Sequence, residues 1–367
     1  MKTKTHRNEI NAESPNFFCE NCRAIYYCSD ECRIASTSGR NGDHDRNACM
    51  RLAEEVSLFE QLVKKTEGGA EDELLGVQES ACNELKRLGV HKHREYRREC
   101  SCFDFVPFGE LVYNELRSVS TYEEYIASEL QYFRKLLRDV NDGDTDWVQK
   151  HARVDHLPFS IAQNILKFNL DIIMESSVLR VYIAGCEKEF DTFERVAKKI
   201  YALTSRDDED GTTRRMEVYF VGPELSKRLH NTVVSFYDGK LQCILLKGLL
   251  GTSAELEGGA PPDIVYCPNA GVAIYTFEWH AAVRWCILNA KGRKKGCLML
   301  FSDYTFEAAW KGYELLLQWI VQQGAEGKTI LPVCENAFKH PTLRKHERVT
   351  TKQVREYSNG FIFGFGT

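Results

Sequence analysis

No run of eighteen apolar residues occurs in this chain, and its first residues lack the apolar core of a secretory leader. We therefore expect neither a membrane-spanning helix nor a secretory signal. Neither sign of charge dominates, because 48 Lys and Arg against 53 Asp and Glu give a formal net charge of −5. That balance argues against a general nucleic-acid coat, so we expect neither nucleic acid nor a membrane as a partner.

Catalytic signatures are scarce as well. The sequence has no G-x-S-x-G elbow, no G-x-x-x-x-G-K-[ST] phosphate loop and no three-glycine dinucleotide loop. Beyond the first fifty residues, cysteines such as Cys186, Cys243, Cys267 and Cys297 stand singly in apolar stretches, which is typical of buried reduced thiols. We expect an intracellular protein, cytoplasmic or nuclear, or mitochondrial if the N-terminus is incomplete.

The 367 residues divide into three predicted parts: a small cysteine-rich module at 1–50, a helical connector at 51–154 and an α/β domain at 155–367. In the connector, apolar residues three or four apart, at Leu52, Val56, Phe59 and Val63, predict a helix. From about residue 178, continuous apolar runs alternate with helical patterns. That alternation predicts a doubly wound, mostly parallel sheet covered on both faces.

The first fifty residues hold a cluster of metal-ligand side chains. They are arranged as a C-x2-C pair, a C-x3-C pair and an H-x4-C pair: Cys19, Cys22, Cys28, Cys32, His44 and Cys49. Each short spacing lets two side chains converge on one ion, and thiolates with an imidazole suit tetrahedral zinc. The sequence therefore predicts zinc as the cofactor.

These residues also carry a resemblance. The string YYCSDEC, preceded by C-x2-C and followed by His and Cys, resembles the MYND-type zinc finger. The resemblance implies one complete site, Cys19, Cys22, His44 and Cys49. Cys28 and Cys32 match the third pair of that family and lack partners, because the first C-x2-C pair is missing. The simplest interpretation is a chain that starts too late. The resemblance also implies a short peptide partner, with Tyr26 and Tyr27 as groove aromatics or as packing for the zinc site.

Residues after the predicted strands are candidates for ligand binding, since ligands of doubly wound sheets bind at the carboxyl ends of the strands. Gly185 is a lone glycine after the first strand, Glu224 follows the second, and Asn269 lies at a required turn. Asp303, after a further strand, is interpreted first as a helix cap.

A second resemblance covers most of residues 178–367. The strings VYFVGPEL, PPDIVYCPNAGVAIYTFEW, FSDYTFEAAW, ENAFKHP and SNGFIFGF look like the C-terminal domain of the mitochondrial splicing suppressor family. It implies a Rossmann-like, methyltransferase-type sheet and a link to organellar gene expression. We expect a zinc-binding protein–protein interaction adaptor without catalytic residues. The alternative is a divergent S-adenosylmethionine-dependent methyltransferase that binds its donor at Gly185, Glu224 and Asn269.

Overall fold

The computed structural model describes residues 17–19, 21–22, 26–27, 34, 44, 46–66, 155–165, 177–204, 214–252, 260–290, 296–324, 328–340 and 356–366. The described residues up to 66 belong to one compact unit, and those from 155 onward, apart from Glu356, to a second. Each unit is described by itself. Most of the predicted connector lies outside the described residues.

The N-terminal unit combines a short hairpin with one long helix. Strands β1 (Phe17–Phe18) and β2 (Tyr26–Tyr27) pair antiparallel. Helix α2 spans Arg46–Thr66, which confirms the helix predicted from the apolar spacing and places its start inside the predicted module at 1–50. Leu52 and Val56, one turn apart, are buried together with Cys22 and Cys49. The apolar stripe of α2 therefore packs against the cysteine cluster.

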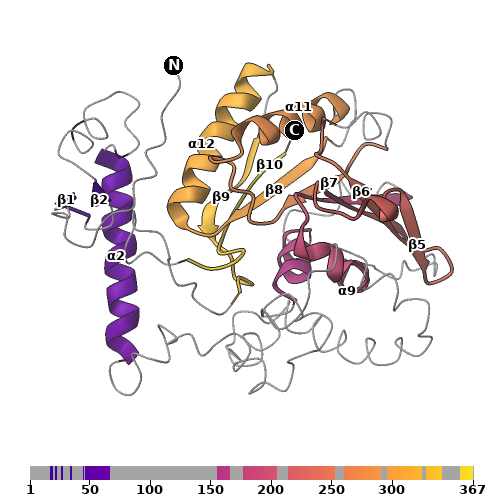
Figure 1. Cartoon of the computed structure of the whole chain (residues 1–367), viewed down its shortest axis with the longest axis horizontal. Helices are drawn as coiled ribbons and strands as arrows, with labels where there is room; N and C mark the ends of the chain where they lie inside the picture. The colour runs from indigo at the N-terminus through magenta and orange to yellow at the C-terminus, as the bar shows by residue number, and fades with distance from the viewer. Residues whose placement is uncertain are drawn as a thin grey trace. The chain divides into compact units, whose positions relative to one another are not determined.

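The second unit is built on an eight-stranded sheet, which confirms the predicted α/β fold (Figure 1). The strand order is β5-β6-β4-β3-β7-β8-β10-β9. The strands are β3 (Val178–Ala184), β4 (Arg215–Gly222), β5 (Thr232–Phe236), β6 (Leu241–Lys247), β7 (Ile264–Cys267), β8 (Leu298–Asp303), β9 (Lys328–Glu335) and β10 (Phe361–Gly366). The five strands from β6 to β8 in this order are parallel to one another.

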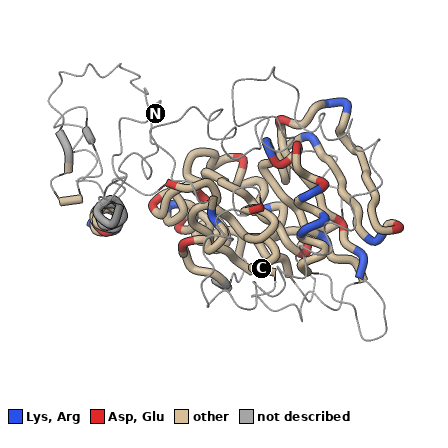
Figure 2. The backbone as a smooth tube through the Cα atoms, turned by 90° about the horizontal axis from the view of Figure 1, so that it is seen from below, with Lys and Arg blue, Asp and Glu red and all other residues tan. Residues whose placement is uncertain are grey.

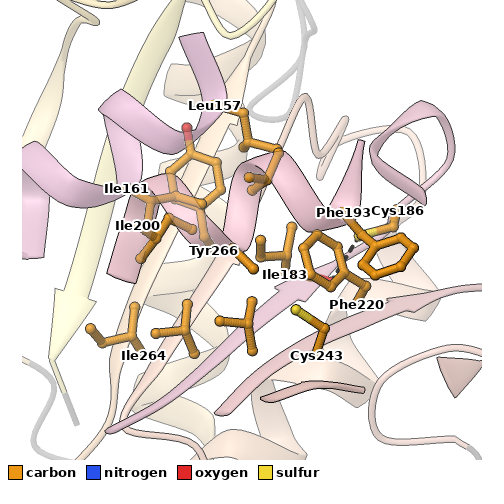
Figure 3. Packing of buried hydrophobic residues seen from close by; sticks show 14 of the residues in the cluster. Leu157, Ile161, Ile183, Cys186, Phe193, Ile200, Phe220, Cys243, Ile264 and Tyr266 are labelled. Carbon is orange, nitrogen blue, oxygen red and sulfur yellow. Dashed lines mark hydrogen bonds between the residues drawn. The ribbon is translucent and has the colours of Figure 1, made fainter. Parts of the chain in front are cut away.

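Helices cover both faces of this sheet. Helix α9 (Phe193–Thr204) and helical residues 155–165 contribute to one apolar cluster. Helices α11 (Thr276–Ala290) and α12 (Phe306–Gln322) contribute to the other. Figure 3 shows the first cluster, in which Phe193 of α9 lies beside Phe220 of β4 with ring centroids 6.0 Å apart. Burial on both faces explains why the central strands are continuous apolar runs.

Two antiparallel strands differ from the sequence prediction. Strand β5 was not predicted, and it pairs with β6 at the edge of the sheet. Strand β10, although it comes last in the chain, inserts antiparallel between β8 and β9. Its Gly364 permits close packing, because a Cβ there would lie 2.6 Å from Leu300 Cδ2.

Charged residues of both signs are mixed over the second unit (Figure 2). Among the described helices, none combines the length and the apolar character that crossing a bilayer requires.

Candidate functional site at the carboxyl edge of the sheet

The order of the parallel strands reverses at β3. This strand pairs with β4 on one side and with β7 on the other, and the chain then continues outward in opposite directions. In doubly wound sheets, ligands bind in the crevice outside the carboxyl ends at such a switch point. The segments that follow Ala184, Gly222 and Cys267 therefore define the candidate site.

Gly185 is the first residue after β3, and it is exposed. Its φ of +80° is a conformation that side chains disfavour. A Cβ at this position would lie 3.2 Å from the Trp279 ring. The Trp279 indole also donates a hydrogen bond of 2.5 Å to the Ala270 carbonyl oxygen. Trp279, which sequence analysis did not single out as a site residue, thus lies beside the residue after β3 and bonds to the segment after β7.

The turn after β4 holds Glu224 at the surface. Gly222 packs against the segment after β3, because a Cβ there would lie only 2.0 Å from the Cys186 carbonyl oxygen. The Lys247 ammonium donates to the carbonyl oxygens of Pro223 and Leu225, the latter at 2.5 Å. These bonds fix the backbone on both sides of Glu224 and leave its exposed side chain directed away from the core.

In the segment after β3, the Glu189 carboxylate hydrogen-bonds to the backbone of the same segment. Glu189 lies in the short helix η2 (Lys188–Asp191), and its Oε2 accepts a hydrogen bond of 2.9 Å from the Glu187 N–H. Burial raises the pKa of Glu189, while bonds from backbone N–H groups oppose the rise. Burial also raises the pKa of the Cys186 thiol well above its usual value. Cys186 is therefore unsuited to act as a nucleophile.

The side chain of Asn269, a predicted donor-binding residue, bonds to the segment before β10. Its Oδ1 accepts from the Asn359 N–H at 2.6 Å, and its Nδ2 donates to Ser358 Oγ at 3.1 Å. Asn359 Oδ1 in turn accepts from the Tyr266 hydroxyl at 2.5 Å. The amide of Asn269 therefore ties the end of β7 to the start of β10, and its φ of 45° fits the turn that the sequence predicted.

Asp303 ends β8, but it does not cap the helix that follows. Its Oδ1 accepts from the neighbouring Tyr304 N–H at 2.8 Å. The N-cap of α12 is Thr305, whose side chain accepts from the Ala308 N–H at 3.1 Å. The predicted cap was therefore wrong by two positions, because Asp303 is still the last residue of β8 and α12 begins only at Phe306.

In the N-terminal unit, the four ligands implied by the finger resemblance come together. The ligand atoms of Cys19, Cys22, His44 and Cys49 all lie within 4.8 Å of one another. Cys19 Sγ lies 3.6 Å from Cys49 Sγ, and Cys22 Sγ lies 3.6 Å from His44 Nε2. Cys28 and Cys32 lie outside the described residues.

The pKa values of two of these thiols move in opposite directions. Burial acts to raise the pKa of Cys19, but hydrogen bonds from the backbone N–H groups of Cys22 and Asn21 outweigh it, so the pKa is lowered. Burial and the neighbouring Cys19 raise the pKa of Cys49, against a hydrogen bond from Asn21. Three thiols and one imidazole at this spacing fit a closed tetrahedral zinc site.

No protein-family model and no curated protein matches the chain. Solved structures that are similar include a protein from Listeria monocytogenes described as a class I S-adenosylmethionine-dependent methyltransferase, at 11% identity over 86% of this chain and 88% of that chain, with a TM-score of 0.32. Precorrin-6y C5,15-methyltransferase from Geobacter metallireducens is 11% identical over 56% of this chain and 89% of its own, with a TM-score of 0.28. Loganic acid methyltransferase is 10% identical over 61% and 97%, with a TM-score of 0.31.

The comparison with solved structures contradicts the prediction of a non-enzymatic protein-interaction adaptor, because these structures are described as methyltransferases, as in the alternative prediction. No family model supports the description of the chain as a MYND-type, protein-binding zinc finger. The resemblances to the two families stay predictions. Similarity at this level concerns the fold alone, so the function is argued below from the strand order and the residues at the carboxyl edge.

Proposed function

We propose that residues 155–367 form an S-adenosylmethionine-dependent methyltransferase domain whose donor lies at the switch point beside β3. The observation that carries the proposal is that an exposed glycine and an exposed carboxylate follow neighbouring strands at this edge of the sheet. Gly185 and Glu224 follow neighbouring parallel strands, in which Ala184 is paired with Val221. In doubly wound folds, an acidic residue near this position binds ribose hydroxyls.

These two residues fit the adenosine half of the donor. Gly185 is exposed, so a ligand can approach its backbone closely. The missing side chain also makes room for the Trp279 ring, which a Cβ there would meet. The Glu224 carboxylate is free to accept hydrogen bonds from the ribose, because the turn is held through backbone carbonyls rather than through this side chain. When bound, the donor supplies an activated methyl group. This chain's residues bind and orient its nucleoside.

Calorimetric titration of the full chain with S-adenosylmethionine and S-adenosylhomocysteine tests the proposal. We expect binding by the wild type. Glu224→Gln should weaken it by about 1–3 kcal/mol, the usual worth of a hydrogen bond to a charged group. Glu314→Gln, on the exposed face of α12, is the matched control and should bind like the wild type. Absence of wild-type binding at millimolar ligand would refute the function, and an unchanged Glu224→Gln affinity would refute the assigned position.

A second proposal concerns the N-terminal unit. We propose that Cys19, Cys22, His44 and Cys49 hold one structural zinc ion, because their ligand atoms already converge. Metal analysis of purified protein should give one zinc per chain through these residues, and substitution of Cys22 by Ser should release it. Retention of zinc by that variant would contradict the ligand assignment.

An intracellular location is also a proposal. It is supported by buried cysteines of the sheet unit that form no disulfide, Cys186, Cys243, Cys267, Cys286 and Cys297. A peptide partner for the hairpin that contains Tyr26 and Tyr27 stays a prediction.

A further inference from the structure

Asn21 makes a contact at the cysteine cluster that no ligand spacing indicates. Its side-chain Nδ2 donates a hydrogen bond to Cys49 Sγ over 3.5 Å. Cys49 comes from a different segment, in the first turn of α2. Asn21 therefore connects the turn between Cys19 and Cys22 to the helix that provides the fourth ligand.

The side chain of Asn21 has a role that its backbone does not share. The backbone N–H groups of Asn21 and Cys22 bond to Cys19, a contact that any residue at position 21 can provide. Only the side-chain amide reaches Cys49. A substitution at position 21 therefore removes the contact to Cys49 and leaves the backbone contacts to Cys19 in place.

We infer that Asn21 is a positioning residue that slows the release of zinc from this cluster, an inference that rests on the zinc site proposed above. Three thiolates around a divalent ion leave one excess negative charge, and a donor N–H on a thiolate offsets part of it. Groups that hydrogen-bond to metal ligands typically change metal affinity by roughly 10–100-fold.

The experiment compares the rate of zinc release from the full-length, zinc-loaded protein into excess chromogenic chelator. Asn21→Asp keeps the shape of the side chain but replaces the donor by a negative acceptor beside Cys49. We expect it to release zinc about tenfold or more faster than the wild type, with Asn21→Ala between the two. Met50→Ala, at an exposed position next to Cys49, is the control and should release zinc at the wild-type rate.

A second measurement separates positioning from general damage. Cobalt-loaded Asn21→Ala should keep the intense visible bands of a four-coordinate thiolate site, because the four ligands are unchanged. Release rates for both Asn21 variants within about twofold of the wild type, well below the usual effect of such a contact, would refute the inference while the zinc site stands. A wild-type protein that holds no zinc would refute both.

Discussion

Asp155→Asn tests the ion pairs that join the helical residues 155–165 to α9. The Asp155 side chain is 1% exposed, and its carboxylate accepts two hydrogen bonds from Arg195, at 2.9 and 3.1 Å. The Lys199 ammonium, itself only 7% exposed, also donates to this carboxylate. Asn preserves the size of the side chain but removes its charge, so Arg195 and Lys199 lose their ion pairs with a buried carboxylate.

Removing one partner of a buried ion pair typically costs 3–5 kcal/mol. Arg195 is 26% exposed and recovers part of its hydration, so we place the loss near the lower limit, at about 3 kcal/mol. For a unit of this size, that loss corresponds to a fall of roughly 6–12 °C in Tm. Glu335→Gln is the matched control, because the Glu335 carboxylate is 38% exposed and its pair with Lys339 is worth at most about 1 kcal/mol.

The dependence on pH has a definite sign. Burial acts to raise the pKa of Asp155, but Arg195 and Lys199 outweigh it, so the folded-state pKa lies below the ordinary value. The carboxylate therefore adds stability above its unfolded pKa, near 4, and this contribution is lost as the pH falls through the lower folded pKa. Asp155→Asn should lack this pH-dependent contribution to stability. Urea denaturation monitored by tryptophan fluorescence, at about one-unit intervals between pH 3 and 7, measures it. A variant as stable as Glu335→Gln at neutral pH would refute the reasoning.

Three further predictions concern the carboxyl edge and the metal cluster. Thr305→Ala should destabilise the sheet unit by about 1 kcal/mol through the lost cap, and equal stability of this variant and the wild type in urea would contradict the assignment. Gly222→Ala should lower the free energy of unfolding by about 3 kcal/mol or more, since its Cβ meets the Cys186 carbonyl. Gly239→Ala, with open space around it, should lower it only by the roughly 1–2 kcal/mol of its left-handed backbone. Similar Tm values for the two variants would argue against the close approach at Gly222. Chelation of zinc should remove hydrogen-exchange protection from the first turns of α2 and leave the sheet protected, because structural zinc supplies the folding energy of small modules; loss of protection in the central strands would show that the two units are coupled.

The sequence determined the fold class because its information was local and repeated. Apolar runs such as those of β3, β4 and β7 are long enough to identify buried strands, and the alternation with helices fixes a parallel arrangement. The same holds for the cysteine cluster, where short spacings bring two ligands together before any tertiary contact forms. Gly185 and Glu224 could be proposed for the site because the residue after a parallel strand lies at a known edge.

Only the tertiary structure decided how those elements are used. The sequence could not tell that β10 runs antiparallel between β8 and β9, because pairing depends on the register of strands far apart in the chain. It could not tell that the Asn269 amide bonds to residues 358 and 359, which lie 89 and 90 positions away. Hydrogen bonds over such separations, like the contact of Trp279 with Gly185, leave no periodic signal in a sequence. They exist only once the sheet has brought the strand ends together.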